Sequence, residues 1–219
     1  MRKLLKINSL PESFDLTEID FVDSFMDNQN RNTISHSPWG KPASPVNVDF
    51  VLAYTKNELL LKYWVKEKQL KATVLENNGR IWTDSCVEMF INLNPEDSFY
   101  YNFEFNCLGK ILFAYRKDRE NREFSDHSIL EGIQCFPSIN TEKIESQLGD
   151  FEWSLFVMIP STVFFKHPDT EFKSGMKLRA NFYKCGDEMI YPHYLSWNMI
   201  DTAKPDFHRP EYFGDILLL

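Results

Sequence analysis

Short segments rich in β-branched and aromatic residues, separated by turn-forming residues, restrict this chain to an all-β architecture. After Pro45 these segments follow one another closely. They are residues 46–55, 58–66, 84–93, 98–106, 110–116, 151–159, 176–185, 193–197 and 215–219. Strands at such short spacing, with little helical pattern between them, predict an antiparallel β-sandwich or barrel.

The length of the chain and its N-terminal pattern indicate how it is organised. All-β domains of ~200–250 residues are common, so we expect residues 1–219 to form one domain. Residues 1–45 are polar and proline-containing, and we interpret them as an irregular segment that wraps around the sandwich, with a short strand near Leu4–Ile7. We expect one or two short helices, within residues 10–28 and 160–166.

Composition excludes several classes of protein. The net charge is −8, and an acidic chain without a clustered basic surface is not a general nucleic-acid binder. No apolar run of ~18 residues is present, so we expect no membrane span. The N-terminal residues lack the apolar core of a signal peptide, which predicts a cytoplasmic protein, or a periplasmic or extracellular one if a signal was trimmed.

Two strand segments place polar side chains on one parity. In residues 101–106 three aromatic residues alternate with Asn102, Glu104 and Asn106, and in residues 84–93 Asp84 and Glu88 share a parity. If the strands are neighbours, these groups project from one sheet face beside Trp82. Sugar recognition needs such a mixture, because a pyranose ring stacks on an aromatic plane and its hydroxyls need polar partners. A simple solvated sheet face explains the same alternation.

Other chemistry has weaker support in the sequence. The carboxylates of Asp84, Glu88 and Glu104 could form the acid pair of a glycosidase, but their separation cannot be read from the sequence. Five histidines and four cysteines show neither HExxH nor CxxC spacing, so no metal site is indicated, and the cysteines are interpreted as small buried hydrophobes. Near the C-terminus, Phe207 and His208 lie in a proline-bounded loop, either as packing residues or as a stacking platform.

The ordered motifs resemble a known family. W-x-D-S-x-V-E-x-F-I begins at Trp82, and Y-N-F-x-F-N at Tyr101; L-S-W-N and P-D-F-H-R-P-E-Y-F-G-D-I-L-L follow. From about residue 46 onward, the chain resembles the family 9 carbohydrate-binding modules, and more specifically the stand-alone family 9-like proteins of Bacteroidetes. The resemblance implies a DOMON-like β-sandwich.

The resemblance also implies site residues. Those modules hold a sugar between two aromatic planes, which match Trp82 and Phe207. The strand carboxylate matches Glu88 and the strand amide Asn106, while an arginine of the modules is replaced by Glu104 here. Phe207 replaces a tryptophan and offers a smaller face. Replacing arginine by glutamate removes donors and leaves acceptors, so the hydroxyl pattern that is read must differ.

These observations predict a non-catalytic protein that binds a mono- or oligosaccharide. The predicted binding residues are Trp82, Glu88, Glu104, Asn106, Phe207 and His208. Two alternatives stay open: a glycan-active hydrolase that uses Asp84 and Glu88, and a DOMON-like haem or redox module with Met89 and His193 as ligands. No cofactor is expected, although the abundant acidic residues would permit a calcium site.

Overall fold

The computed structural model describes residues 2–11, 14–140 and 142–219 and contains two packed, mostly antiparallel sheets. Residues 12 and 13, inside the region predicted to hold a first helix, lie outside the described residues. The larger sheet has the strand order β1-β13-β11-β5-β6-β7-β8, with β12 paired to β11. Its strands are β1 (Leu4–Ile7), β5 (Cys86–Asn92), β6 (Tyr100–Asn106), β7 (Ile111–Arg116), β8 (Arg122–Phe124), β11 (Lys177–Cys185), β12 (Tyr194–Ser196) and β13 (Gly214–Leu218).

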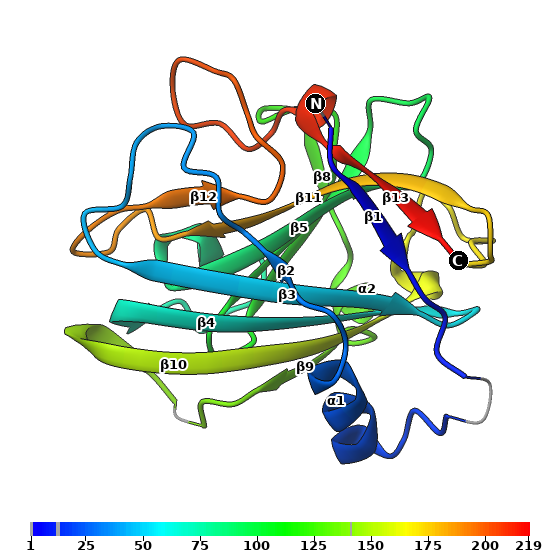
Figure 1. The fold of residues 1–219 in the computed structure, drawn as a ribbon, viewed down its shortest axis with the longest axis horizontal. Helices are drawn as coiled ribbons and strands as arrows, with labels where there is room; N and C mark the ends of the chain where they lie inside the picture. Colours follow the sequence, from blue (N-terminus) through cyan, green and yellow to red (C-terminus); the bar gives the residue numbers. More distant parts are fainter. Residues whose placement is uncertain (1, 12–13, 141) are drawn as a thin grey trace.

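The smaller sheet has the order β2-β3-β4-β10-β9. Its strands are β2 (Asn32–Thr33), β3 (Val46–Tyr54), β4 (Glu58–Ala72), β9 (Gln134–Pro137) and β10 (Ile144–Pro160). The helices are α1 (Ile19–Asp27) and the single turn α2 (His127–Leu130), with 3₁₀ turns at Ile81–Thr83, Ser161–Val163 and Pro210–Tyr212. The β-sandwich predicted from the sequence is therefore confirmed (Figure 1). None of the described helices is long and apolar enough to cross a membrane.

The main core lies between the two sheets and is built from the apolar parity of their strands. Phe50 of β3 stacks on Phe182 of β11 at 3.9 Å between ring centroids, which joins the sheets directly. Tyr101, Phe103 and Phe105, predicted to share one face of β6, all lie in this core. Most of the high aromatic content is thus explained by packing, because large rings fill the space between two sheets efficiently.

Residues 1–45 are more regular than predicted. β1 forms at Leu4–Ile7, as expected, and pairs in parallel with β13 at the end of the chain. α1 packs under the smaller sheet, where Val22 and Met26 join a second apolar cluster with Leu60 (Figure 1). The segment is therefore part of the fold on both sides of the sandwich.

Strands β4 and β10 are longer than their sequence pattern predicted. The prediction ended β4 at residue 66 and began β10 at residue 151, because the intervening residues are polar. The two strands instead pair along most of their length, with irregularities in the register. Lys66 bonds Glu152 across the pair, and Lys68 pairs with Asp150. Opposite charges that pair across neighbouring strands stabilise these polar strand ends, which the pattern of apolar residues does not reveal.

The outer face of the larger sheet is also covered. Residues 198–213 fold over it, and Phe207 and Phe213 pack against Phe90 and Tyr183 in a further apolar cluster. The polar parity of β5 and β6 therefore does not face water: Glu88 and Glu104 are each 3% exposed. The interpretation of this parity as a solvated sheet face is wrong, because the C-terminal loop lies over it.

Candidate functional site

A cavity of about 640 Å³ lies over the outer face of the larger sheet, among β5, β6, β7 and β11 and the loops above them. It is bordered by residues from five separate parts of the chain. They are Trp82, Glu88, Glu104, Arg116, Arg119, Glu120, Arg122, Cys185, Asp187, Tyr194, Lys204, Pro205, Asp206, Phe207 and His208. Five of the six residues predicted to bind a ligand are among them.

Two buried carboxyl groups lie on the cavity floor. Glu88 and Glu104 are direct partners across the β5–β6 register, so both project toward the covering loops. Burial raises the pKa of both carboxyls, Glu104 to about 7, and the neighbouring carboxylate adds to the rise for Glu88. Glu104 Oε1 accepts a hydrogen bond from Asn102 Nδ2 at 3.0 Å, whereas its Oε2 has no partner among the described residues. One acceptor is thus left for a ligand.

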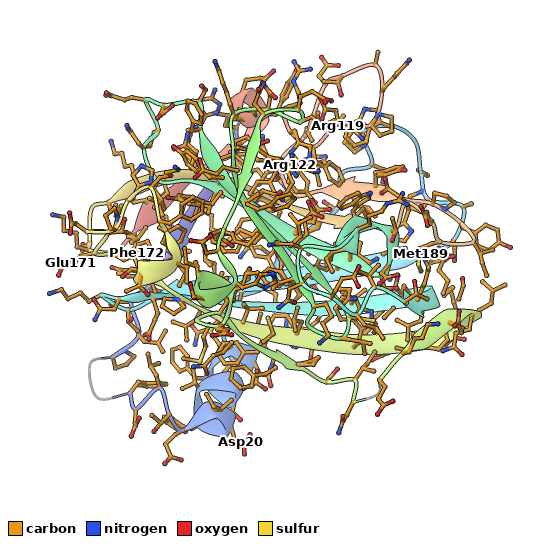
Figure 2. The ribbon with its side chains drawn as sticks, turned by 180° about the vertical axis from the view of Figure 1, so that it is seen from behind. Asp20, Arg119, Arg122, Glu171, Phe172 and Met189 are labelled. Atoms are coloured by element: carbon orange, nitrogen blue, oxygen red, sulfur yellow. The ribbon has the colours of Figure 1, made fainter. Side chains whose placement is uncertain are left out.

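Arginines supply the donors of the cavity. Arg116 ends β7 and is 2% exposed. Its Nε donates to Asn102 Oδ1 at 2.7 Å and its Nη1 to the Arg119 carbonyl at 3.0 Å, which fixes the guanidinium. Arg119 comes from the following turn and Arg122 begins β8, and both lie on the side of the molecule opposite α1 (Figure 2). Within the described residues, no ion pair within 4.0 Å joins these three arginines to a carboxylate, which leaves their charge for a ligand.

Aromatic side chains form the walls. Trp82 belongs to the 3₁₀ turn that leads into β5 and is half-buried. Phe207 stacks on Tyr183 at 4.1 Å and is 9% exposed, with the Trp39 ring tilted against it at 5.6 Å. Most of the Phe207 ring is therefore already packed against protein. Tyr194, half-buried on β12, adds a further ring to the cavity.

His208 is held as a neutral ring. It stacks on Phe90 at 4.9 Å, and its Nδ1 shares a hydrogen bond with the Tyr100 hydroxyl at 2.9 Å. Burial, together with the nearby arginines, holds the pKa of His208 well below the usual value. It can therefore act as a hydrogen-bonding group without charge.

Asn106, the sixth predicted residue, does not border the cavity. Its Nδ2 donates to the Val74 carbonyl at 2.9 Å and to Asp84 Oδ2 at 3.1 Å, and its Oδ1 accepts from two backbone amides of the β6–β7 turn. All its polar atoms are used in holding neighbouring loops. The side chain points to the predicted face of β6. However, the β6–β7 turn folds back over it and binds its amide oxygen, so no polar atom is left for a ligand.

Apart from Glu88, the residues of the two alternative functions lie elsewhere. Asp84 is fully buried and accepts hydrogen bonds from the amides of Thr73 and Val74, so it fixes the end of β4. Met89 lies in the core between the sheets, whereas His193 Nε2 is 3.0 Å from Lys184 Nζ. None of the three borders the cavity described above.

The sequence interpretation did not identify several residues that border the cavity, namely Arg116, Arg119, Arg122, Asp187 and Tyr194. Arg116 lies on the outward face of β7 together with Leu112 and Ala114. This alternation along the strand is the sequence signal that could have identified it as a cavity residue. The others lie in turns or in a short edge strand, where no periodicity indicates which way a side chain points.

Comparisons with known proteins agree on the family. The family model described as Carbohydrate-binding family 9 matches residues 20–218. A provisionally assigned carbohydrate-binding protein from Bacteroides uniformis ATCC 8492 is 32% identical, with 100% of both chains covered and a TM-score of 0.89. No curated protein matches the chain.

Two solved structures of more distant proteins have the same fold. Both are family 9 carbohydrate-binding modules from Caldicellulosiruptor kristjanssonii, 13% identical to this chain. The complex with cellotriose has a TM-score of 0.62 and covers 99% of this chain and 93% of the module. The complex with glucose has a TM-score of 0.60, with 99% and 96% covered. Given the family match over most of the sequence, the chain belongs to carbohydrate-binding family 9.

Proposed function

We propose that this protein binds a mono- or oligosaccharide in the cavity over the larger sheet. The main support is one observation: the buried carboxyl groups of Glu88 and Glu104 and the buried guanidinium of Arg116, without ion-pair partners among the described residues, border the same cavity as a half-buried tryptophan. Unpaired polar groups are costly to bury, so an arrangement of this kind is retained where a ligand satisfies them. Family membership and the sugar complexes of the Caldicellulosiruptor modules support the same proposal.

The aromatic contribution is assigned to Trp82 first. Its ring borders the cavity and is half-buried, with the Arg80 guanidinium 5.9 Å from its centroid, and no other aromatic ring stacks on it among the described residues. A pyranose ring can stack its C–H face on such an indole. Phe207 shapes the opposite part of the cavity, but its stacking on Tyr183 leaves it little free surface. Tyr194 provides an additional aromatic contact.

The hydroxyl groups of the sugar would meet both acceptors and donors. Glu88 and Glu104 offer carboxyl oxygens, and His208 and Asp187 lie beside them. The resemblance places an arginine of other modules at the position of Glu104. In this chain Arg116, on the neighbouring strand β7, brings a guanidinium into the same cavity. The donor function is thus retained from another strand, while the pattern of hydroxyls that can be read is altered.

Isothermal titration with a panel of neutral sugars, beginning with glucose and cellotriose, tests the proposal. Trp82→Ala should weaken binding about fivefold or more, since stacking contributes ~1 kcal/mol or more. The control is Trp64→Ala, because Trp64 lies on β4 beneath α1 and not at the cavity. Equal affinity of all three proteins would contradict the role of Trp82.

The same titration separates binding from catalysis. A non-catalytic protein leaves cellotriose intact, so no new reducing ends should appear during prolonged incubation. Glu88→Gln keeps the shape of the carboxyl group and removes its acid function. Turnover by the wild type that this variant abolishes would favour a hydrolase instead.

A further inference from the structure

Two cysteines and one glutamate meet at the cavity floor. Cys86 begins β5 and Cys185 ends β11, and the register pairs them directly across the sheet. Glu88 follows two residues after Cys86, so its side chain shares their face. One ligand atom from each of the three residues lies within 4.8 Å of the other two. The Cys86–Glu88–Cys185 cluster therefore brings two thiols and a carboxyl group together.

The distances within this cluster suit a small metal ion. Cys185 Sγ is 3.0 Å from Glu88 Oε1, and Cys86 Sγ is 3.9 Å from the same oxygen. In a tetrahedral zinc site, with Zn–S of ~2.3 Å and Zn–O of ~2.1 Å, the ligand atoms are separated by about 3.6 to 3.8 Å. Side-chain adjustments of under about 1 Å would convert the cluster into three corners of such a site.

No strong competing contact holds the thiols. Besides the carboxyl group and each other, Cys86 Sγ approaches the Val87 carbonyl at 3.7 Å and Cys185 Sγ approaches the Trp82 carbonyl at 3.6 Å. Burial raises the pKa of both thiols and of Glu88, because each charged form lacks water. A divalent cation would reverse this penalty, since it stabilises all three anionic forms at once.

We propose that Cys86, Glu88 and Cys185 form a binding site for Zn²⁺. Two thiolates select a borderline-soft ion over Mg²⁺ or Ca²⁺, and three protein ligands leave one tetrahedral position open. Glu88 and Cys185 border the cavity, so the ion has an entry path and water or a ligand hydroxyl can occupy the open position. Sugar binding is not needed for this inference, and the site stands or falls independently of the proposed function.

Cd²⁺ titration of the reduced full-length protein tests the site, because thiolates bound to Cd²⁺ give an ultraviolet charge-transfer band. We expect one Cd²⁺ per chain, a band with the intensity of two thiolates, and release of two to three protons per ion, from the two thiols and from Glu88. Cys185→Ser and Cys86→Ala should each lower the affinity more than ~100-fold, because changes outside the ligand shell already cost 10–100-fold. The control is Cys135→Ser, since Cys135 lies on β9 of the other sheet.

A measurement without substitutions keeps the proposal testable if a variant fails to fold. In the wild type, Zn²⁺ should protect Cys86 and Cys185 from alkylation under partly denaturing conditions, as mapped by mass spectrometry, and leave Cys107 and Cys135 unprotected. Absence of the charge-transfer band would overturn the proposal. So would a band that survives in the Cys86→Ala/Cys185→Ser double variant, or equal protection of all four thiols.

Discussion

His193 belongs to a buried cluster of polar groups inside the sandwich, and this cluster predicts a specific loss of stability in acid. Lys184 Nζ is 3.1 Å from Glu67 Oε2 and 3.0 Å from His193 Nε2. Trp153 Nε1 donates to the other oxygen of Glu67 at 2.8 Å. Because the ammonium group of Lys184 faces Nε2, that nitrogen must accept, and Nδ1 donates to the Tyr191 carbonyl at 3.2 Å.

Protonation of His193 is therefore unfavourable in the folded protein. Burial, and then the charge of Lys184, lower the pKa of His193 from 6.5 to about 3. The unfolded chain binds a proton near pH 6.5 and the folded chain does not, so the free energy of unfolding falls as the pH decreases below 6.5. Between pH 7 and pH 5 these two values give a loss of about 2 kcal/mol.

The substitution His193→Gln isolates this effect. Its amide oxygen can accept from Lys184 and its amide nitrogen can donate to the Tyr191 carbonyl, but the group does not titrate. Urea unfolding at pH 7 and pH 5 should show a difference about 2 kcal/mol smaller in the variant than in the wild type. His127→Gln serves as the control, because His127 is an exposed histidine on α2, outside this cluster. If wild type and His193→Gln lose the same stability between the two pH values, the reasoning is refuted.

Three further substitutions test other parts of the structure. Arg116→Lys should weaken sugar binding about tenfold in titration calorimetry, because the ammonium group cannot keep the bond to Asn102 while reaching the ligand. The control is Arg209→Lys, which should have no effect, because Arg209 belongs to an exposed ion pair outside the cavity. Lys62→Met removes ion pairs of 2.6 and 2.7 Å to Asp23 and Asp27 of α1, so amide exchange in α1 should become roughly fivefold faster, for a loss of ~1 kcal/mol, with exchange in β6 unchanged. Gly214→Ala places a Cβ against the Trp197 ring and 3.1 Å from the Lys3 carbonyl, so chemical denaturation should show that the free energy of unfolding falls by about 1–3 kcal/mol. An unchanged free energy of unfolding would contradict this steric argument.

Local patterns were sufficient to predict most strands and which residues of β6 face the core. Tyr101, Phe103 and Phe105 alternate with polar residues, and this alternation can be read from neighbouring positions in the sequence. Successive side chains of a strand point to opposite faces, so the alternation predicts which of them face the core. Strand ends were predicted less well. β4 and β10 extend beyond their apolar stretches, where Lys68 pairs with Asp150, and a contact between distant residues leaves no trace in a local window.

The candidate site also combines features that the sequence predicts with features that only the tertiary structure shows. The sequence suggested Glu88, Glu104 and Trp82 from parity and resemblance, but not that residues 198–213 cover them. The covering loop encloses the cavity over this polar face, and the resulting burial raises the pKa values of Glu88 and Glu104. Asn106 has the same parity as Glu104 and is excluded from the cavity only because the β6–β7 turn binds its side chain.

The sequence by itself determined the sandwich class, the family and the parity of the strands, since these depend on the order of neighbouring residues. Only the tertiary structure decided which residues meet. Glu88 and Cys185 are 97 residues apart in the chain, without any local spacing to connect them, and the β5–β11 register brings their atoms within 3.0 Å. Register is fixed by the packing of whole sheet faces, and a one-residue shift would turn Cys185 into the core and abolish the cluster.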